Sequence, residues 1–462
     1  MTDRLTTDLA EATAGETVRA IAAGAISALE ATDAAIARIE ARDGAINAVV
    51  VRDFDRARTA AKAADAAIAR GERRPLLGVP MTVKEANWVA GLPTTWGMEM
   101  WKDWKAPVDG VGIARLKGAG AIILGKTNVP PMLADFQSDN PVYGRTNNPW
   151  DVMRSPGGSS GGSAAALAAG MVPLEFGSDI GGSIRIPAGF CGVYGHKPSY
   201  GVVPLRGHTP PGLEGSDVPV AVVGPMARTA ADLDLALGVL AGPDNSEAVG
   251  YSLNFRPPRH DHLADYRVLI LDHHPLAATD EEIVAALNGL GDRLEDLGAR
   301  VDRQTELLPD LTEAQGVYGA ILNTAMTRGQ PGARSPSAHD WMGLLDAQLA
   351  VRRLWARLFE GFDVVLAPTL GTLAFPHDDS PDMFARTLLL NGETTSYFSQ
   401  IAWSGVATLA HLPATAAPMG LSRGGLPMGV QIIGPYLEDR TTIAFAGLLE
   451  REFGGFVKPP GY

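Results

Sequence analysis

Short apolar runs alternate with helix-like stretches from about residue 76 onward, and this alternation restricts the fold more than any other feature. The runs are flanked by Gly or Pro, and they lie at residues 76–85, 121–128, 172–179, 266–272, 362–369 and 427–435. Helix-like stretches lie between them at residues 161–171, 229–242 and 280–298. Strands that alternate with helices predict an α/β sheet covered by helices on both faces.

The first part of the chain has a different texture. Residues 16–42 and 54–71 are rich in Ala, carry apolar residues at helical spacing and contain no internal Pro. We expect residues 1–75 to form a helical wrap around a main α/β domain of residues 76–462. The Pro-containing polar stretch 241–262 could separate two domains. Because the α/β texture resumes after it, we favour a surface excursion from one compact unit.

Charge and composition exclude several classes of protein. The 462 residues include 52 acidic and 39 basic side chains, for a net charge of −13, and no basic block stands out. Direct binding to nucleic acid is therefore not expected. The single cysteine, Cys191, rules out an internal disulfide. A polar start without signal-peptide character and the lack of a long apolar stretch predict a cytoplasmic protein without membrane association.

Three local motifs could carry chemistry, and each also has an ordinary structural interpretation. Residues 155–170 read Gly-Gly-Ser-Ser-Gly-Gly and then an Ala-rich helix, which fits either a flexible linker or a rigid turn at a helix start. Residues 176–192 place two glycines before Ser183, which fits either a tight turn or an oxyanion hole of consecutive N–H groups. Within residues 78–86, Lys84 follows an apolar run, so it could lie exposed at a strand edge or at the end of a strand inside the protein.

Together the three motifs resemble the amidase signature family. Gly-Gly-Ser-Ser-Gly-Gly, the later Gly-Ser-Asp-Ile-Gly-Gly-Ser-Ile-Arg and the upstream Val-Lys-Glu match that family in order and spacing. Further segments that look like family landmarks lie at 118–130, 147–151, 195–204, 223–233, 362–369 and 425–435, so the similarity spans roughly residues 8–450. The resemblance implies a large mixed, mostly parallel, twisted sheet covered by helices on both faces.

The resemblance also implies a role for each matching residue. Ser183 would be the nucleophile, and Ser159, preceded by a cis peptide bond, would bridge Ser183 and Lys84. The backbone N–H groups of Ile180, Gly181, Gly182 and Ser183 would form the oxyanion hole. The residues that would support this arrangement are Ser160, Ser178, Asp179 and Arg185.

This assignment makes chemical sense. A serine hydroxyl needs a base to become a good nucleophile. None of the nine histidines lies in a recognisable triad motif, whereas a lysine can act as the base when it is uncharged. Burial disfavours the ammonium form. We therefore predict that Lys84 is buried and neutral. No metal or other cofactor is required by this chemistry, and none is expected.

Two other patterns match functional motifs but do not indicate a nucleotide or metal site. Residues 120–127 fit the P-loop pattern Gly-x4-Gly-Lys-Thr, but their apolar middle reads as a strand and Asn-Val-Pro-Pro follows where a helix should begin. The histidine pairs His260/His262 and His273/His274 have no Cys or Glu nearby at ligand spacing, so solvated loop histidines are the better interpretation.

The substrate is less well defined. By resemblance, residues 129–144 lie along the acyl pocket, with Leu133 and Phe136 as candidate walls and residues 391–399 as a further wall. Aromatic side chains crowd the stretch after Lys84 and fit either a pocket or the core: Trp88, Trp96, Trp101 and Trp104. We expect a hydrophobic or aromatic carboxamide.

Three kinds of protein are compatible with the motifs. The first is a stand-alone amidase that acts on a small-molecule amide, either as a monomer or as a homodimer. The second is the glutamine-hydrolysing subunit of an aminoacyl-tRNA amidotransferase. The third is a non-catalytic scaffold, against which the intact set of Lys84, Ser159 and Ser183 argues.

Overall fold

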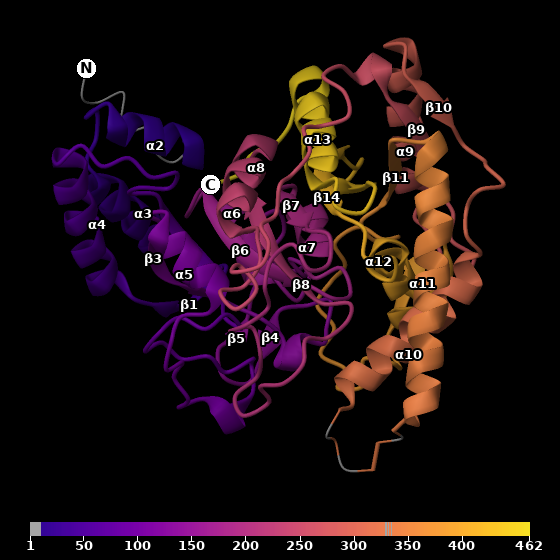
Figure 1. The fold of residues 1–462 in the computed structure, drawn as a ribbon, viewed down its shortest axis with the longest axis horizontal. Helices are drawn as coiled ribbons and strands as arrows, with labels where there is room; N and C mark the ends of the chain where they lie inside the picture. Colours follow the sequence, from indigo (N-terminus) through magenta and orange to yellow (C-terminus); the bar gives the residue numbers. More distant parts are fainter. Residues whose placement is uncertain (1–10, 329, 331, 334) are drawn as a thin grey trace.

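A large sheet runs through the middle of the molecule in the computed structural model, which describes residues 11–328, 330, 332, 333 and 335–462 (Figure 1). The order of its eleven strands across the sheet is β1-β3-β2-β6-β8-β7-β14-β15-β11-β9-β10. The strands are β1 (Val49–Arg52), β2 (Pro80–Lys84), β3 (Ile122–Thr127), β6 (Leu174–Asp179), β7 (Tyr194–Lys197), β8 (Val222–Ala227), β9 (Arg267–Ile270), β10 (Arg300–Asp302), β11 (Val364–Pro368), β14 (Ala414–Leu421) and β15 (Pro427–Ile433). Two small hairpins stand apart: β4 (Asp139–Asn140) with β5 (Gly144–Arg145), and β12 (Thr387–Leu390) with β13 (Glu393–Ser396).

The mixed character of the sheet is confirmed, but the expectation of mostly parallel pairing needs correction. Strands pair in parallel towards the two ends, β3 with β2, β2 with β6, β11 with β9 and β9 with β10. The central neighbours from β6 to β11 and the edge pair β1–β3 are antiparallel. Buried apolar runs look alike in both directions, so their pattern does not reveal direction. The short connection 422–426 shows that β14 and β15 are antiparallel, because parallel neighbours need a crossover of about a dozen residues or more.

Helices cover both faces of the sheet, as expected. They are α2 (Ala14–Ala22), α3 (Ala28–Arg42), α4 (Phe54–Ala69), α5 (Val111–Gly118), α6 (Gly161–Ala168), α7 (Arg185–Cys191), α8 (Ala230–Leu240), α9 (Glu281–Asp296), α10 (Leu311–Met326), α11 (Ala338–Gly361), α12 (Ile401–Thr408) and α13 (Asp439–Phe453). On β11, Val364 and Leu366 join the apolar cluster that contains α8, α9 and α13. Val365 and Ala367, which point to the other face, pack with α11 and α12.

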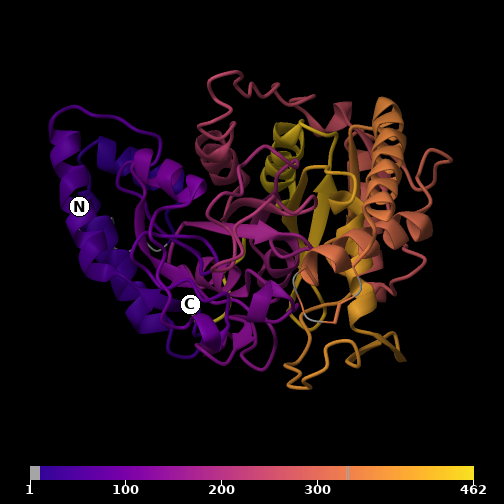
Figure 2. The ribbon, with the colours of Figure 1, turned by 60° about the horizontal axis from the view of Figure 1, so that its bottom comes forward.

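The amino-terminal helices flank one end of the sheet, and α10 and α11 flank the other (Figures 1 and 2). The predicted helix 16–42 is two helices, because the chain turns at Gly24 (φ +70°) and restarts α3 with Ser27 and Glu30 capping each other. The predicted helix 54–71 corresponds to α4. Residues 1–75 also supply β1 to the main sheet, and their status as a separate wrap stays a prediction.

Residues 241–262 contain no helix or strand and are mostly exposed, and their interpretation as an excursion from one compact unit stays a prediction. Arg259 ties the end of this segment to the body, since its guanidinium donates to Glu438 and Asp363. Within the described residues, every helix is either too short or too polar to cross a bilayer.

Candidate active site

The Gly- and Ser-rich segment 155–170 is a rigid part of the interior. Every residue in it is buried. A Cβ atom on Gly158 would lie 2.4 Å from the carbonyl oxygen of Asp135 and 2.5 Å from that of Gln137, so only glycine fits there. The peptide bond between Gly158 and Ser159 is cis. The close packing around Gly158 favours the rigid turn over the flexible linker.

Lys84 is the last residue of β2, and its side chain is fully buried. Its Nζ atom lies 2.7 Å from Ser159 Oγ, 2.9 Å from Ser178 Oγ and 3.3 Å from the Ser178 carbonyl oxygen. Burial lowers the pKa of Lys84 to about 7, although the carboxylates of Asp179 and Glu175 favour the charged amine. The predicted contact between Lys84 and Ser159 is thus present, and burial favours the uncharged amine.

Ser183 lies in the turn between β6 and α7, and 6% of its surface is exposed. The turn is linked to the Ser159 segment by a hydrogen bond from the Ser160 N–H to the Ser183 carbonyl, at 3.1 Å. Among the described residues, no hydrogen bond joins the hydroxyls of Ser183 and Ser159. Ser183 thus lies next to the Lys84–Ser159 pair, but its hydroxyl makes no hydrogen bond to the hydroxyl of Ser159.

The N–H groups around Ser183 differ in their availability. Gly182, at φ +90°, donates its N–H to Asp179 Oδ1 at 2.9 Å, which differs from the expectation that it is a free oxyanion donor. In the described part of the chain, the N–H groups of Ile180, Gly181 and Ser183 donate to no protein acceptor. Three of the four predicted donors are therefore free to bind a ligand.

Asp179 and Arg185 form a buried ion pair directly under this turn. Arg185 Nη2 donates to Asp179 Oδ1 at 2.9 Å, and the two side chains are almost wholly shielded from solvent. Burial opposes ionisation of Asp179, but the Arg185 guanidinium holds its pKa down at about 2. Ser160 lies in the same layer, with its hydroxyl 3.3 Å from the Ser178 carbonyl oxygen. All four predicted supporting residues, Ser160, Ser178, Asp179 and Arg185, thus contact the site.

Several residues that contact the site escaped sequence reasoning. Tyr318 of α10 donates its hydroxyl to the Ile180 carbonyl at 2.7 Å. Arg185 is also held by Gln431 Oε1 at 2.8 Å and by Thr408 Oγ1 at 2.9 Å. Glu175 is buried, its carboxylate favours the charged form of Lys84, and burial raises the pKa of Glu175 to about 7. Tyr318 and Thr408 lie outside every motif, because a tyrosine or a threonine in a helix reads as an ordinary packing residue. Gln431 lies in the landmark 425–435 and Glu175 in the apolar run 172–179, but neither pattern links the residue to the site.

The predicted pocket residues fall into two apolar clusters. Leu133 packs with Ala86, Trp96 and Val129, and Trp101 lies against them. Phe136 belongs to a larger cluster that contains Tyr318 and Tyr397 and reaches Ile180, and its ring centroid is 5.2 Å from that of Tyr397.

The remaining tryptophans and the predicted wall 391–399 are also placed. Trp88 and Trp104 contact each other, with ring centroids 5.2 Å apart, and Trp88 lines a separate cavity of about 680 Å³. The segment 391–399 includes β13, and its Tyr397 and Phe398 join the cluster that contains Phe136.

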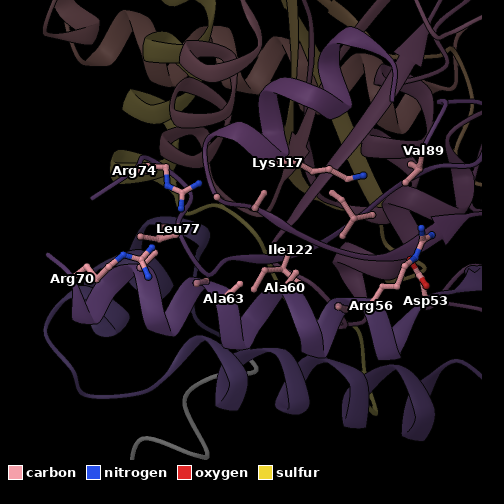
Figure 3. Close-up of a pocket in the computed structure, with 16 residues that line it drawn as sticks. Asp53, Arg56, Ala60, Ala63, Arg70, Arg74, Leu77, Val89, Lys117 and Ile122 are labelled. Atoms are coloured by element: carbon pink, nitrogen blue, oxygen red, sulfur yellow. The ribbon is translucent and has the colours of Figure 1, made fainter. Parts of the chain in front are cut away.

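A groove between α4 and the strand β3 is unrelated to this site (Figure 3). Alanines of α4 line one side of it, and Arg56, Arg70, Arg74 and Lys117 surround it. Each of these four cations has a carboxylate partner within 3.2 Å. No residue of the Ser183 site lines the groove.

The structure shows what the P-loop pattern and the histidine pairs form. Residues 122–127 are strand β3, and the buried Lys126 donates to Thr94 Oγ1 at 2.7 Å, so the P-loop pattern is a strand with a structural lysine. The expectation of solvated loop histidines is wrong for His274, which is buried with its ring against Trp403. His260 is half-buried, and its Nε2 lies 3.2 Å from Asp363 Oδ2. The described residues contain no group of three or more His, Cys, Asp or Glu side chains arranged to hold a metal ion.

The chain is similar to known proteins over most of its length. The chain matches the amidase family over residues 30–328 and 318–443. It is 34% identical over 486 residues to a glutamyl-tRNA(Gln) amidotransferase subunit of Anaeromyxobacter dehalogenans (strain 2CP-C), covering 95% of this chain and 96% of that protein. It is 34% identical over 427 residues to fatty-acid amide hydrolase 2-A of Danio rerio, covering 84% and 77%. The solved structure of a bacterial aryl acylamidase, described as an amidase signature enzyme, superposes with a TM-score of 0.81 at 27% identity, covering 96% of each chain.

Proposed function

The chain belongs to the amidase signature family of hydrolases, and from this premise we propose that it hydrolyses a hydrophobic or aromatic carboxamide through an acyl-enzyme on Ser183. The products are a carboxylate and ammonia or an amine. The observation that carries the proposal is the buried Lys84 amine within 2.7 Å of the Ser159 hydroxyl.

The contacts of Lys84 suit an uncharged amine. A neutral amine has two N–H donors and one lone pair. Ser178 offers two acceptors, its hydroxyl and its carbonyl oxygen, at 2.9 and 3.3 Å. The lone pair is then left to accept the O–H of Ser159. Lys84 in this state is a base aimed at Ser159.

The proton moves along this chain of groups. Ser183 Oγ attacks the amide carbonyl carbon while its proton passes to Ser159 Oγ, and the Ser159 proton passes to Lys84 Nζ. The same path run backwards delivers the proton to the leaving nitrogen, and the C–N bond breaks. Water, activated by the same relay, then hydrolyses the acyl-enzyme. The missing contact between Ser159 and Ser183 has to form when the substrate binds, as is common for catalytic hydrogen bonds.

The free N–H groups of the turn supply the electrostatic part of the mechanism. We assign those of Ile180, Gly181 and Ser183 to the oxyanion that forms on the substrate oxygen. Gly182 instead fixes the shape of the turn through Asp179. The Asp179–Arg185 pair keeps that carboxylate ionised, so it remains an acceptor over the whole working pH range.

The surroundings of Ile180 favour an apolar acyl group. Ile180 is partly exposed and packs at the margin of the cluster that contains Phe136. Other partly exposed apolar residues at that margin are Val218, Val317, Trp341 and Phe398. An acyl group that reaches Ser183 from this side meets hydrocarbon and aromatic surface. The named likeness to an aryl acylamidase points the same way.

Glutamine hydrolysis within an aminoacyl-tRNA amidotransferase is the second candidate, favoured by the likeness to one component of that enzyme. A substrate panel separates the two. The purified chain is given aliphatic, aryl and amino-acid amides and glutamine, without ATP or a partner, and Ser183→Ala is the control. Hydrolysis of an aryl or aliphatic amide by the chain alone supports our proposal. Glutamine hydrolysis that appears only with partner proteins and tRNA would replace it with the second candidate.

A further inference from the structure

The turn that carries Ser183 is flexible by composition, yet each of its peptide groups is held from outside. Two adjacent glycines, Gly181 and Gly182, leave the backbone many conformations. The Gly182 N–H is held by Asp179, the Gly182 carbonyl accepts from the Ile186 N–H at 2.7 Å, and the Ser183 carbonyl accepts from the Ser160 N–H. The peptide group between Ile180 and Gly181 is held by a side chain from a distant helix.

That side chain is Tyr318, which is fully buried in α10. Its hydroxyl donates to the Ile180 carbonyl oxygen at 2.7 Å. A trans peptide group is planar, and its C=O and N–H point in opposite directions. Fixing the Ile180 carbonyl on one side therefore fixes the direction of the Gly181 N–H on the other side. This N–H is one of the three that donate to no protein acceptor in the described residues.

The ring of Tyr318 is itself tightly held. It belongs to the apolar cluster of Phe136 and Ile401, and Ile401 also lies close to Gly181. A Cβ atom on Gly405 of α12 would come within 2.8 Å of Tyr318 Cδ1, so α12 packs directly on the ring. Burial raises the pKa of Tyr318, which keeps the hydroxyl protonated and able to donate at any working pH.

We propose that Tyr318 is a positioning residue for the oxyanion hole, whose hydroxyl orients the Ile180–Gly181 peptide so that the Gly181 N–H faces the reacting carbonyl. This inference rests on the proposed function of Ser183. It extends that function to α10, where Tyr318 lies 138 positions beyond Ile180 in the sequence. The hydrogen bond also polarises the peptide group and strengthens the Gly181 N–H as a donor.

The test replaces Tyr318 with Phe, which removes only the hydroxyl oxygen. Tyr318→Phe is expected to lower kcat by about 10- to 100-fold on the best amide of the panel, somewhat less than the loss of a whole oxyanion donor, with KM unchanged within about twofold. Tyr266→Phe is the matched control. Tyr266 is also fully buried, but it lies in the cluster that contains α9 and α13, and its hydroxyl donates to the His260 carbonyl oxygen at 3.2 Å instead of to the catalytic turn. It is expected to change kcat by less than about threefold.

A second readout separates orientation from general damage. An aldehyde analogue of the substrate forms a tetrahedral adduct with Ser183 and needs the oxyanion hole, whereas the primary alcohol with the same carbon skeleton has no carbonyl and forms no adduct. Tyr318→Phe should weaken inhibition by the aldehyde as much as it lowers kcat and leave inhibition by the alcohol unchanged. If Tyr318→Phe does not fold, Gly405→Ala displaces the ring and should give the same selective loss.

Three outcomes would overturn the inference: wild-type kcat in Tyr318→Phe, equal losses in Tyr318→Phe and Tyr266→Phe, or equal weakening of aldehyde and alcohol inhibition. The proposed function fails separately, if Ser183→Ala keeps wild-type activity. If Ser183→Ala is inactive and Tyr318→Phe is fully active, only the proposed role of Tyr318 is contradicted.

Discussion

The Lys84 amine lies 2.7 Å from the Ser159 hydroxyl, and neither side chain is exposed to solvent. Because the amine is shielded from solvent, the cost of burial falls on the ammonium form. This one relationship turns an ordinary strand-end lysine into a candidate base.

The pH dependence of activity follows from this burial. The base must be uncharged, so kcat/KM should rise with pH through about 7, where Lys84 loses its proton, and level off above it. The pKa of His208, which burial and the charge of Lys84 lower to about 3, lies outside that window. The check is the pH–rate profile of the wild type and of Lys84→Ala, which should lose most activity and the limb near pH 7.

Glu175 provides a finer control of the same profile. Its carboxylate favours the charged form of Lys84, so Glu175→Gln should lower the pKa of Lys84 and move the acid limb to lower pH. Glu85→Gln removes a buried carboxyl that faces Lys126 instead and should leave the limb in place. A limb that moves to higher pH in Glu175→Gln would contradict the assignment of Lys84 as the base.

Arg185 stabilises the protein as well as the turn. Arg185→Leu leaves Asp179 charged and buried without its partner, so the free energy of unfolding should fall by roughly 3–5 kcal/mol in urea denaturation. The double variant Asp179→Asn/Arg185→Leu should lose less than the sum of the two single variants. Additive losses would mean that the pair is not coupled.

The same pair makes an acid-stability prediction. The pKa of Asp179 in the folded state, about 2, lies below its ordinary value of 3.8, so its contribution is complete above about pH 4 and fades as pH falls towards 2. In Arg185→Leu this fading should be weaker, since the group that lowers the pKa is gone.

Gly158 should tolerate no side chain. Gly158→Ala places a methyl group 2.4 Å from the Asp135 carbonyl oxygen, which no rotamer can relieve, so activity and thermal stability should both fall sharply. Gly289→Ala in α9 is the matched control, because nothing lies within 4 Å of the added methyl group. It should stabilise the protein by about 0.5–1 kcal/mol. A Gly158→Ala variant with wild-type Tm and activity would show that the segment is not rigid.

Phe136 tests the acyl pocket. Phe136→Ala should lower kcat/KM for an aryl amide about 10-fold more than for acetamide, because only the larger acyl group uses that surface. Phe190→Ala, buried in the same cluster on α7, is expected to affect both substrates alike. Equal effects of the two variants on the aryl amide would remove Phe136 from the pocket.

The sequence was most informative where backbone constraints are strict. Gly158, Ser159 and Ser183 lie in glycine-rich turns, and Lys84 follows an apolar run. Each pattern alone also fits an ordinary turn or strand end, and only the joint resemblance to a family assigned their roles. The break at Gly24 was missed in the predicted helix 16–42, although the capping-box spacing of Ser27 and Glu30 signals a new helix start. Tyr318 and Thr408 were not readable, because each lies on a helix whose docking onto the turn depends on long-range packing. The partner of the Gly182 N–H likewise depends on the local backbone direction, which composition does not specify.

Trapping the nucleophile tests the central claim most directly. The purified chain is treated with a fluorophosphonate, digested and examined by mass spectrometry, with Ser183→Ala as the control. The account predicts a single phosphonylated peptide that carries the label on Ser183, complete loss of labelling in Ser183→Ala and loss of amide hydrolysis in step with labelling. Labelling at another residue with Ser183 unmodified, or hydrolysis that persists after Ser183 is fully labelled, would contradict it.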